Sequence, residues 1–277
     1  MKIGVSLPPA LLCGAASSAH QEKLLEHGIP SFLTRLREAG CTHIELRAVR
    51  SDTPEDIVTG AARALRAAGL QMTVHGVLTD EPAEAFWKRL HPLLAVQSDL
   101  CVTVHSVSSR ETTVSLLRRL SEYAACRQPG ARLALENNRS KKGDNIDLVE
   151  CAGVYSTILE TGMNNIGVCW DFGHFRWDVL THPALLPDAL PPRAFAERAI
   201  HTHIHSVYAD TTHFPLTMGE LPLADYVRLL TESGYTGVYN LEPEPERWDA
   251  SIDAAREIIR SVELLKETVQ RIKEELK

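Results

Sequence analysis

The sequence predicts an α/β protein built as a single (β/α)8 barrel, the TIM-barrel architecture, over residues 1–277. Short apolar runs rich in β-branched residues alternate with longer segments of helical periodicity, and eight such alternations fill the chain. Eight strand–helix units occupy roughly 250 residues in barrels of this kind, so the chain has the length of one barrel. Its 44% hydrophobic and 23% charged residues are ordinary for a protein with a large core.

The predicted strands are apolar along most of their length, as expected where helices cover a parallel sheet. They span residues 2–7, 42–46, 71–77, 100–107, 132–137, 166–172, 200–207 and 237–242. The predicted helices span residues 22–39, 54–68, 82–96, 110–126, 146–161, 193–198, 222–233 and 249–274. Gly40, Gly69 and Gly234 follow helices, where glycine commonly ends them. Residues 8–20 and 176–192 interrupt this pattern and are predicted to be irregular loops, the second of them over the active face.

Charge and cysteine content narrow the class of protein. A net charge of −7 gives no basic footprint of the kind that nucleic-acid-binding proteins carry, so nucleic acid is not an expected partner. The six cysteines are scattered without a CxxC pair, which predicts reduced, buried thiols in a cytoplasmic protein. No segment approaches the ~18–20 apolar residues of a membrane span. We therefore expect a cytoplasmic monomer or homo-oligomer with no membrane partner.

Residues of metal-ligand type stand at the C-terminal ends of the last four predicted strands. They are Glu136 in RLALEN, Asp171 and His174 in IGVCWDFGH, His203 and His205 in IHTHIHSV, and Glu242 in VYNLEPE. Successive strands place these residues about 35 positions apart, the length of one strand–helix unit. Because the C-terminal ends of barrel strands meet at one face, the side chains should converge there. Carboxylates with an imidazole suit Mn²⁺, Co²⁺, Mg²⁺ or Zn²⁺, and the spacing does not choose among them.

The first half of the chain adds three candidates at the same face. His75 and His105 end their strands and are either site residues or hydrogen-bonded core histidines. Arg47, two residues after Glu45, either binds a substrate phosphate or carboxylate or pairs with a neighbouring acid. His203, by contrast, is interpreted as structural.

Four motifs in order carry a resemblance to a known family: LEN, WDFGH, HIH followed by HFPL, and LEP, within residues 131–245. The chain resembles the xylose isomerase-like TIM-barrel superfamily, and the eightfold pattern extends the resemblance over the whole chain. That superfamily contains sugar isomerases and epimerases as well as metal-dependent apurinic/apyrimidinic endonucleases.

The resemblance implies one divalent metal ion held by Glu136, Asp171, His205 and Glu242. His203 and His205 share a strand face, and the family pattern favours His205. By the same resemblance, Glu136 and Glu242 are also the catalytic acid/base pair. His174, His105, His75 and Arg47 are then the candidate substrate-binding residues.

The function implied is a metal-dependent isomerase or epimerase that acts on a sugar or sugar phosphate through an enediolate. The alternative is a multi-zinc phosphodiesterase of the endonuclease type, with His75, His105, His174 and His213 as further zinc ligands. The net charge of −7 counts against it, as does DTTH at residues 210–213, where the endonucleases have an Asp-x-His pair. A third hypothesis is a non-enzymatic barrel that senses a polyol or a metal. One bound metal favours enediolate chemistry, and two or three favour phosphodiester hydrolysis.

Overall fold

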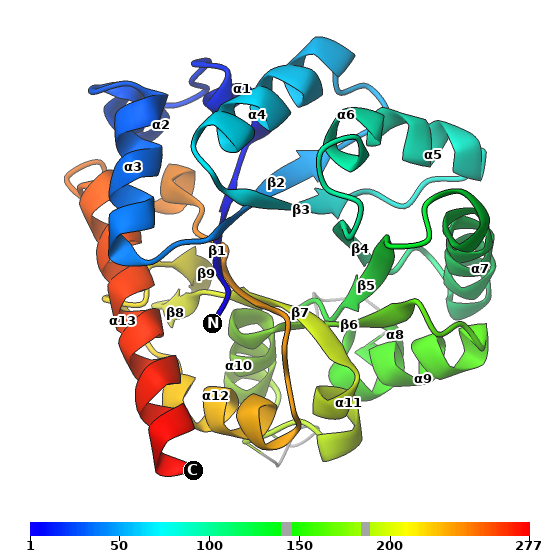
Figure 1. Cartoon of the computed structure of the whole chain (residues 1–277). Helices are drawn as coiled ribbons and strands as arrows, with labels where there is room; N and C mark the ends of the chain where they lie inside the picture. The colour runs from blue at the N-terminus through cyan, green and yellow to red at the C-terminus, as the bar shows by residue number, and fades with distance from the viewer. Residues whose placement is uncertain (140–145, 184–188) are drawn as a thin grey trace.

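A closed barrel of eight parallel strands forms the centre of the computed structural model, which describes residues 1–139, 146–183 and 189–277 (Figure 1). The strands follow the order β1-β10-β7-β6-β5-β4-β3-β2 around the barrel. Their bounds are β1 Ile3–Leu7, β2 His43–Val49, β3 Gln71–Gly76, β4 Cys101–His105, β5 Arg132–Glu136, β6 Ile166–Asp171, β7 Ala199–Ile204 and β10 Val238–Leu241. The predicted (β/α)8 architecture and its eight strands are confirmed.

The helices surround the barrel (Figure 1). They are α1 Pro9–Leu12, α2 Ala19–Leu25, α3 Ile29–Ala39, α4 Glu55–Ala67, α5 Ala83–Arg89, α6 His91–Leu94, α7 Arg110–Arg127, α8 Ile146–Val149, α9 Cys151–Thr161, α10 Phe172–Thr181, α11 Arg193–Glu197, α12 Leu223–Glu232 and α13 Ala254–Glu275, with a short 3-10 helix, η1, at Pro245–Arg247. Three predicted helices are divided, and the helix predicted over 146–161 forms α8 and α9. Gly28, at a φ of +77°, separates α2 from α3, and Pro92 follows the break between α5 and α6.

The prediction of an irregular loop over residues 176–192 was wrong for its first part, because α10 extends through Thr181. Asp171 begins this helix: its carboxylate accepts the backbone N–H of His174 at 2.6 Å. The prolines that suggested a loop begin only at Pro183, and residues 184–188 lie outside the described part of the chain. Likewise, the predicted loop 8–20 contains α1 and the start of α2.

The chain forms a hairpin directly after β7, where the sequence predicted a strand through residue 207. Strand β8 (Ser206–Tyr208) pairs antiparallel with β9 (Thr211–Phe214). His213 in β9 has a φ of +68°, a conformation uncommon outside glycine. Its carbonyl accepts hydrogen bonds from the Trp248 indole at 2.9 Å and the Glu244 amide at 3.1 Å, which hold this backbone in place. The hairpin thereby fixes His213 above the end of β7.

The barrel interior is polar, although the strands read as apolar overall. Alternate strand residues point inward, and several of these are hydroxyl, amide, carboxylate or imidazole side chains. Buried polar residues on the strands include Ser6, Glu45, Thr73, Thr103, His203 and Asn240, each at most 3% exposed. The residues between them pack against the helices; Trp170, for example, contacts Phe172, Phe195 and Tyr226. Side chains that could bind a ligand or a metal ion therefore lie in the centre of the barrel.

The cysteines and helices add two observations. All six cysteines are free thiols. Four of them are buried, as predicted, but Cys13 and Cys126 are exposed, so the prediction of burial was wrong for these two. Among the described residues, no helix combines the length and the apolar character needed to cross a membrane.

His43, at the start of β2, gives a first testable prediction about stability. Burial, together with the nearby His201 and Lys2, lowers the pKa of His43 to about 4. Since the ordinary value of 6.5 applies to the unfolded chain, acidification protonates the unfolded state first. The stability that neutral His43 supplies is therefore present above pH ~6.5 and is lost as the pH falls towards about 4, by at most about 3 kcal/mol.

Replacing His43 by glutamine should therefore weaken the pH dependence of stability. Urea unfolding at pH 7 and pH 5 measures the free energy of unfolding of both proteins. We expect His43→Gln to lose less stability than the wild type between these two pH values. An equal loss in both proteins would show that His43 does not titrate in this range.

Candidate metal centre

Four side chains converge at the C-terminal ends of β5, β6, β7 and β10. They are Glu136, Asp171, His203 and Glu242, and one ligand atom from each lies within 4.8 Å of the others. Glu136 and Asp171 are the last residues of their strands, and Glu242 directly follows β10. Each of the four is at most 3% exposed. The barrel therefore brings three carboxylates and one imidazole to a single buried point.

The polar atoms at this point fit a divalent cation. Neither carboxylate oxygen of Glu136 nor Nδ1 of His203 finds a hydrogen-bond partner among the described residues. Nδ1 of His203 nevertheless lies 3.0 Å from Glu136 Oε2 and 3.5 Å from Glu242 Oε2. Leaving buried polar atoms unpartnered costs about 1–3 kcal/mol each. A cation with oxygen and nitrogen ligands would satisfy all of them at once.

Glu136 and Glu242 are held in their ionised form. Burial raises the pKa of Glu242, but the neighbouring His203 and His75 outweigh this effect and lower it to about 2. Burial likewise opposes ionisation of Glu136, and the imidazoles of His203 and His105 bring its pKa well below the usual range. Both carboxylates thus offer lone pairs at neutral pH, either to a cation or to a proton.

His205, which the sequence interpretation placed among the metal ligands, contacts Asp171, whereas His203 is the imidazole whose ligand atom is grouped with those of all three carboxylates. Metal binding by His205 stays a prediction. Both ring nitrogens of His205 are engaged: Nδ1 accepts the backbone N–H of His213 at 3.0 Å, and Nε2 lies 3.1 Å from Asp171 Oδ2. The physical reason is that β7 ends at Ile204, so His205 belongs to the turn into β8. Gly173 admits the ring, because a Cβ there would lie 2.0 Å from it.

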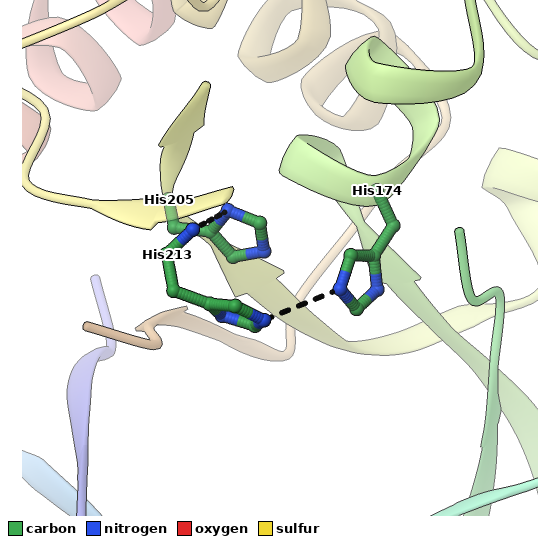
Figure 2. A group of neighbouring side chains, drawn as sticks. All are labelled: His174, His205 and His213. Atoms are coloured by element: carbon green, nitrogen blue, oxygen red, sulfur yellow. Dashed lines mark hydrogen bonds between the residues drawn. The ribbon is translucent and has the colours of Figure 1, made fainter. Parts of the chain in front are cut away.

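His174 on α10, His205 in the turn after β7 and His213 on β9 form a second cluster (Figure 2). His174 and His205 place this cluster beside Asp171. Nε2 of His174 lies 3.4 Å from Nε2 of His213, and Nδ1 of His174 lies 3.2 Å from Asp171 Oδ2. The ligand atoms of the three histidines lie within 4.8 Å of one another, so this cluster is also a group that could hold a metal. His174 and His205 both contact the same carboxylate and so orient Asp171.

His75 and His105 lie on the opposite side of Glu136. Nε2 of His105 is 3.1 Å from Glu136 Oε2, while Nδ1 of His75 is 3.3 Å from Glu242 Oε1. The side chain of His105 is 38% exposed and that of His75 is 12% exposed. The two histidines line a cavity that also contacts Leu78 and Val107. They are the two most exposed of the histidines that contact Glu136 or Glu242, so they mark the open side of the centre.

Arg47 lies apart from this centre, over the segment after β10. Its guanidinium donates to the carbonyl of Pro243 at 3.0 Å and forms ion pairs of 3.7 Å with Glu244 and 3.5 Å with Glu246. Of the two interpretations of Arg47, the structure thus contains the pairing with neighbouring acids. A role in substrate binding stays a prediction.

A family model places the chain among barrel proteins. A family model described as "Xylose isomerase-like TIM barrel" matches residues 33–268. One curated relative, an uncharacterized protein of Methanocaldococcus jannaschii, is 32% identical over 73 residues. That match covers 25% of this chain and 27% of the relative, so it spans only about a quarter of the relative's length.

Several solved structures share the fold over nearly the full chain. An L-ribulose 3-epimerase superposes with a TM-score of 0.67 at 17% identity, covering 100% of this chain and 97% of the other. A xylose isomerase domain protein from Alicyclobacillus acidocaldarius gives 0.66 at 17% identity, covering 99% of each chain. D-psicose 3-epimerase from Clostridium cellulolyticum H10 gives 0.65 at 13% identity, covering 98% of this chain and 99% of the other. At these identities the likeness concerns the fold.

Proposed function

The chain belongs to the xylose isomerase-like TIM-barrel family, and from this premise we propose that it is a divalent-metal-dependent isomerase or epimerase of a sugar or sugar phosphate. The observation that carries the proposal is the convergence of Glu136, Asp171, His203 and Glu242 at the C-terminal ends of the strands, where barrel enzymes have their active sites. The epimerases among the structures of the same fold support it. In this proposal these four residues hold Mn²⁺, Co²⁺, Mg²⁺ or Zn²⁺.

The reaction we propose begins with removal of the proton next to a sugar carbonyl. An ionised carboxylate, Glu136 or Glu242, takes this proton, and the C–H electron pair passes into an enediolate. A positioned general base of this kind contributes roughly 10²–10⁴-fold to the rate. The bound cation supplies Lewis-acid stabilisation of the developing negative charge, worth several kcal/mol. In epimerisation, the second carboxylate first takes up a proton from solvent and then delivers it to the opposite face. In isomerisation, the first carboxylate returns its proton to the neighbouring carbon while a hydroxyl proton passes to the former carbonyl oxygen.

The histidines at the open side of the centre are proposed to bind the substrate. His75 and His105 flank Glu136 and Glu242 and have ring nitrogens suited to hydrogen bonds with sugar hydroxyl groups. His174 could bind a further substrate oxygen next to Asp171. A cytoplasmic location and a homo-oligomeric state remain predictions.

Hydrogen exchange with solvent tests the proposal directly. The protein is loaded with Mn²⁺ or Co²⁺ and incubated in D₂O with a panel of free and phosphorylated ketoses. We expect deuterium at the carbon next to the carbonyl, together with a new isomer, both followed by NMR. Protein treated with a chelator should catalyse neither. Metal binding without exchange on any member of the panel would contradict the proposal and favour a sensor.

The phosphodiesterase alternative has its own supporting observation. His75, His105 and Glu136 form one further group of suitable ligand atoms, and His174, His205 and His213 form another. The net charge of −7 counts against a nucleic-acid substrate. The metal content of protein purified with excess Zn²⁺ and cleavage of a duplex with one abasic site separate the two functions. Two or three zinc ions and a cut strand would support the alternative, whereas an intact duplex would exclude it.

A further inference from the structure

Glu45 is a fully buried carboxylate on β2 that contacts one of the proposed metal ligands. It is 0% exposed, and its oxygens lie 2.9 and 3.0 Å from Nε2 of His203. Nε2 of His201, two residues earlier on β7, lies 2.9 Å from Glu45 Oε2. The carboxylate therefore bridges two histidines of one strand from the opposite wall of the barrel.

Two further donors hold Glu45 in place. Ser6 on β1 donates its hydroxyl to Oε1, and Asn240 on β10 donates its amide to the same oxygen at 3.2 Å. With the two histidines, these groups give the carboxylate four partners from three strands. Taking an ionised carboxylate out of water costs several kcal/mol unless such partners compensate. The network is complete at Glu45, so the position and orientation of its oxygens are fixed.

This arrangement determines which nitrogen of His203 faces the candidate metal centre. A neutral imidazole carries one N–H, and an ionised carboxylate can only accept. Ionised carboxylates face both nitrogens: Glu45 lies at Nε2, and Glu136 and Glu242 lie 3.0 and 3.5 Å from Nδ1. When a metal ion occupies the centre beside Nδ1, Glu45 holds the one N–H on Nε2 and Nδ1 offers its lone pair. We propose that Glu45 is a positioning residue that sets the tautomer and orientation of His203 for metal binding through Nδ1. This inference rests on the metal centre of the proposed function.

The test compares metal affinity in the full-length protein with and without this carboxylate. Glu45→Gln keeps the size of the side chain and removes its charge. Carboxylate partners of ligand histidines contribute about 10–100-fold to metal affinity, so the dissociation constant of Co²⁺ should rise by about that factor. Titration by visible absorption measures the affinity and also reports any change in cobalt geometry. Thr73→Val is the matched control, because Thr73 is the register partner of Glu45 on β3 and faces the same interior; it should bind Co²⁺ like the wild type.

The outcomes separate this inference from the proposed function. If the wild type and Glu45→Gln bind Co²⁺ equally, the role of Glu45 is wrong and the metal centre stands. If the wild type binds metal but turns over no sugar, the proposed function fails and the role of Glu45 stands. If the wild type binds no metal, both the proposed function and the role of Glu45 are wrong.

A measurement on the wild-type protein covers the case in which Glu45→Gln does not fold. Long-range ¹H–¹⁵N correlation of histidine-labelled, Zn²⁺-loaded protein identifies the protonated nitrogen of each ring. We expect His203 to carry its proton on Nε2, with the signal assigned by its loss in His203→Gln. A proton on Nδ1 would overturn the inference.

Discussion

Replacing Glu242 by glutamine is expected to lower kcat by about 10²–10⁴-fold in metal-saturated protein, because glutamine keeps the shape of the side chain but cannot accept the α-proton. Glu136→Gln should have an effect of the same order. The two glutamates lie on strands separated by β7 and β6, with Nδ1 of His203 near both, so they approach a shared point from different sides. Steady-state kinetics on the sugar that shows exchange measures the effect, at a metal concentration that saturates each variant.

Deuterium exchange separates the roles of the two carboxylates. The variant that retains the base should still exchange the α-proton while losing conversion to the isomer, and the variant that lacks the base should lose both. Glu220→Gln is a suitable control, because Glu220 is a solvent-exposed acid that pairs with Arg176. It should keep wild-type activity. If both Glu136→Gln and Glu242→Gln retain full activity, neither carboxylate is the base.

The sequence was sufficient for the barrel and for the convergence of the strand-end residues, because both depend on regular spacing. Each strand is a short apolar run, and a parallel barrel brings the strand ends together whatever the helices do. Glu136, Asp171 and Glu242 could therefore be predicted from their positions at strand ends. Helix α10 was missed because it begins directly at Asp171, without the loop that separates most strands from their helices.

Other features depend on contacts that no local pattern contains. The partners of Glu45 on β7 lie 156 and 158 residues away, so the local sequence around Glu45 did not indicate them. His203 and His205 share a strand face in an ideal strand. Which of them reaches the carboxylates depends on where β7 ends and on the space that Gly173 leaves, and both are properties of the folded barrel.

Exchanging His203 or His205 for glutamine should therefore have very different effects on metal affinity. His203→Gln removes the only imidazole in the four-residue centre, so the dissociation constant of Co²⁺ should rise by more than about 100-fold. This exceeds the effect of about 10–100-fold expected for residues that contact a metal ligand without binding the metal. His205→Gln removes a contact to Asp171 and the acceptor of the His213 backbone N–H, and should weaken binding by about tenfold, at the lower end of this range.

Calorimetric titration with Co²⁺ measures both affinities, and circular dichroism and metal-free unfolding confirm that each variant is folded. The two substitutions are matched in kind and lie two residues apart, so a general loss of stability would affect both in a similar way. The reverse order, with His205→Gln the more damaging, would assign the ligand to His205, as the family pattern suggested. It would also mean that Glu45 contacts no histidine ligand of the metal, since its partners on β7 are His203 and His201.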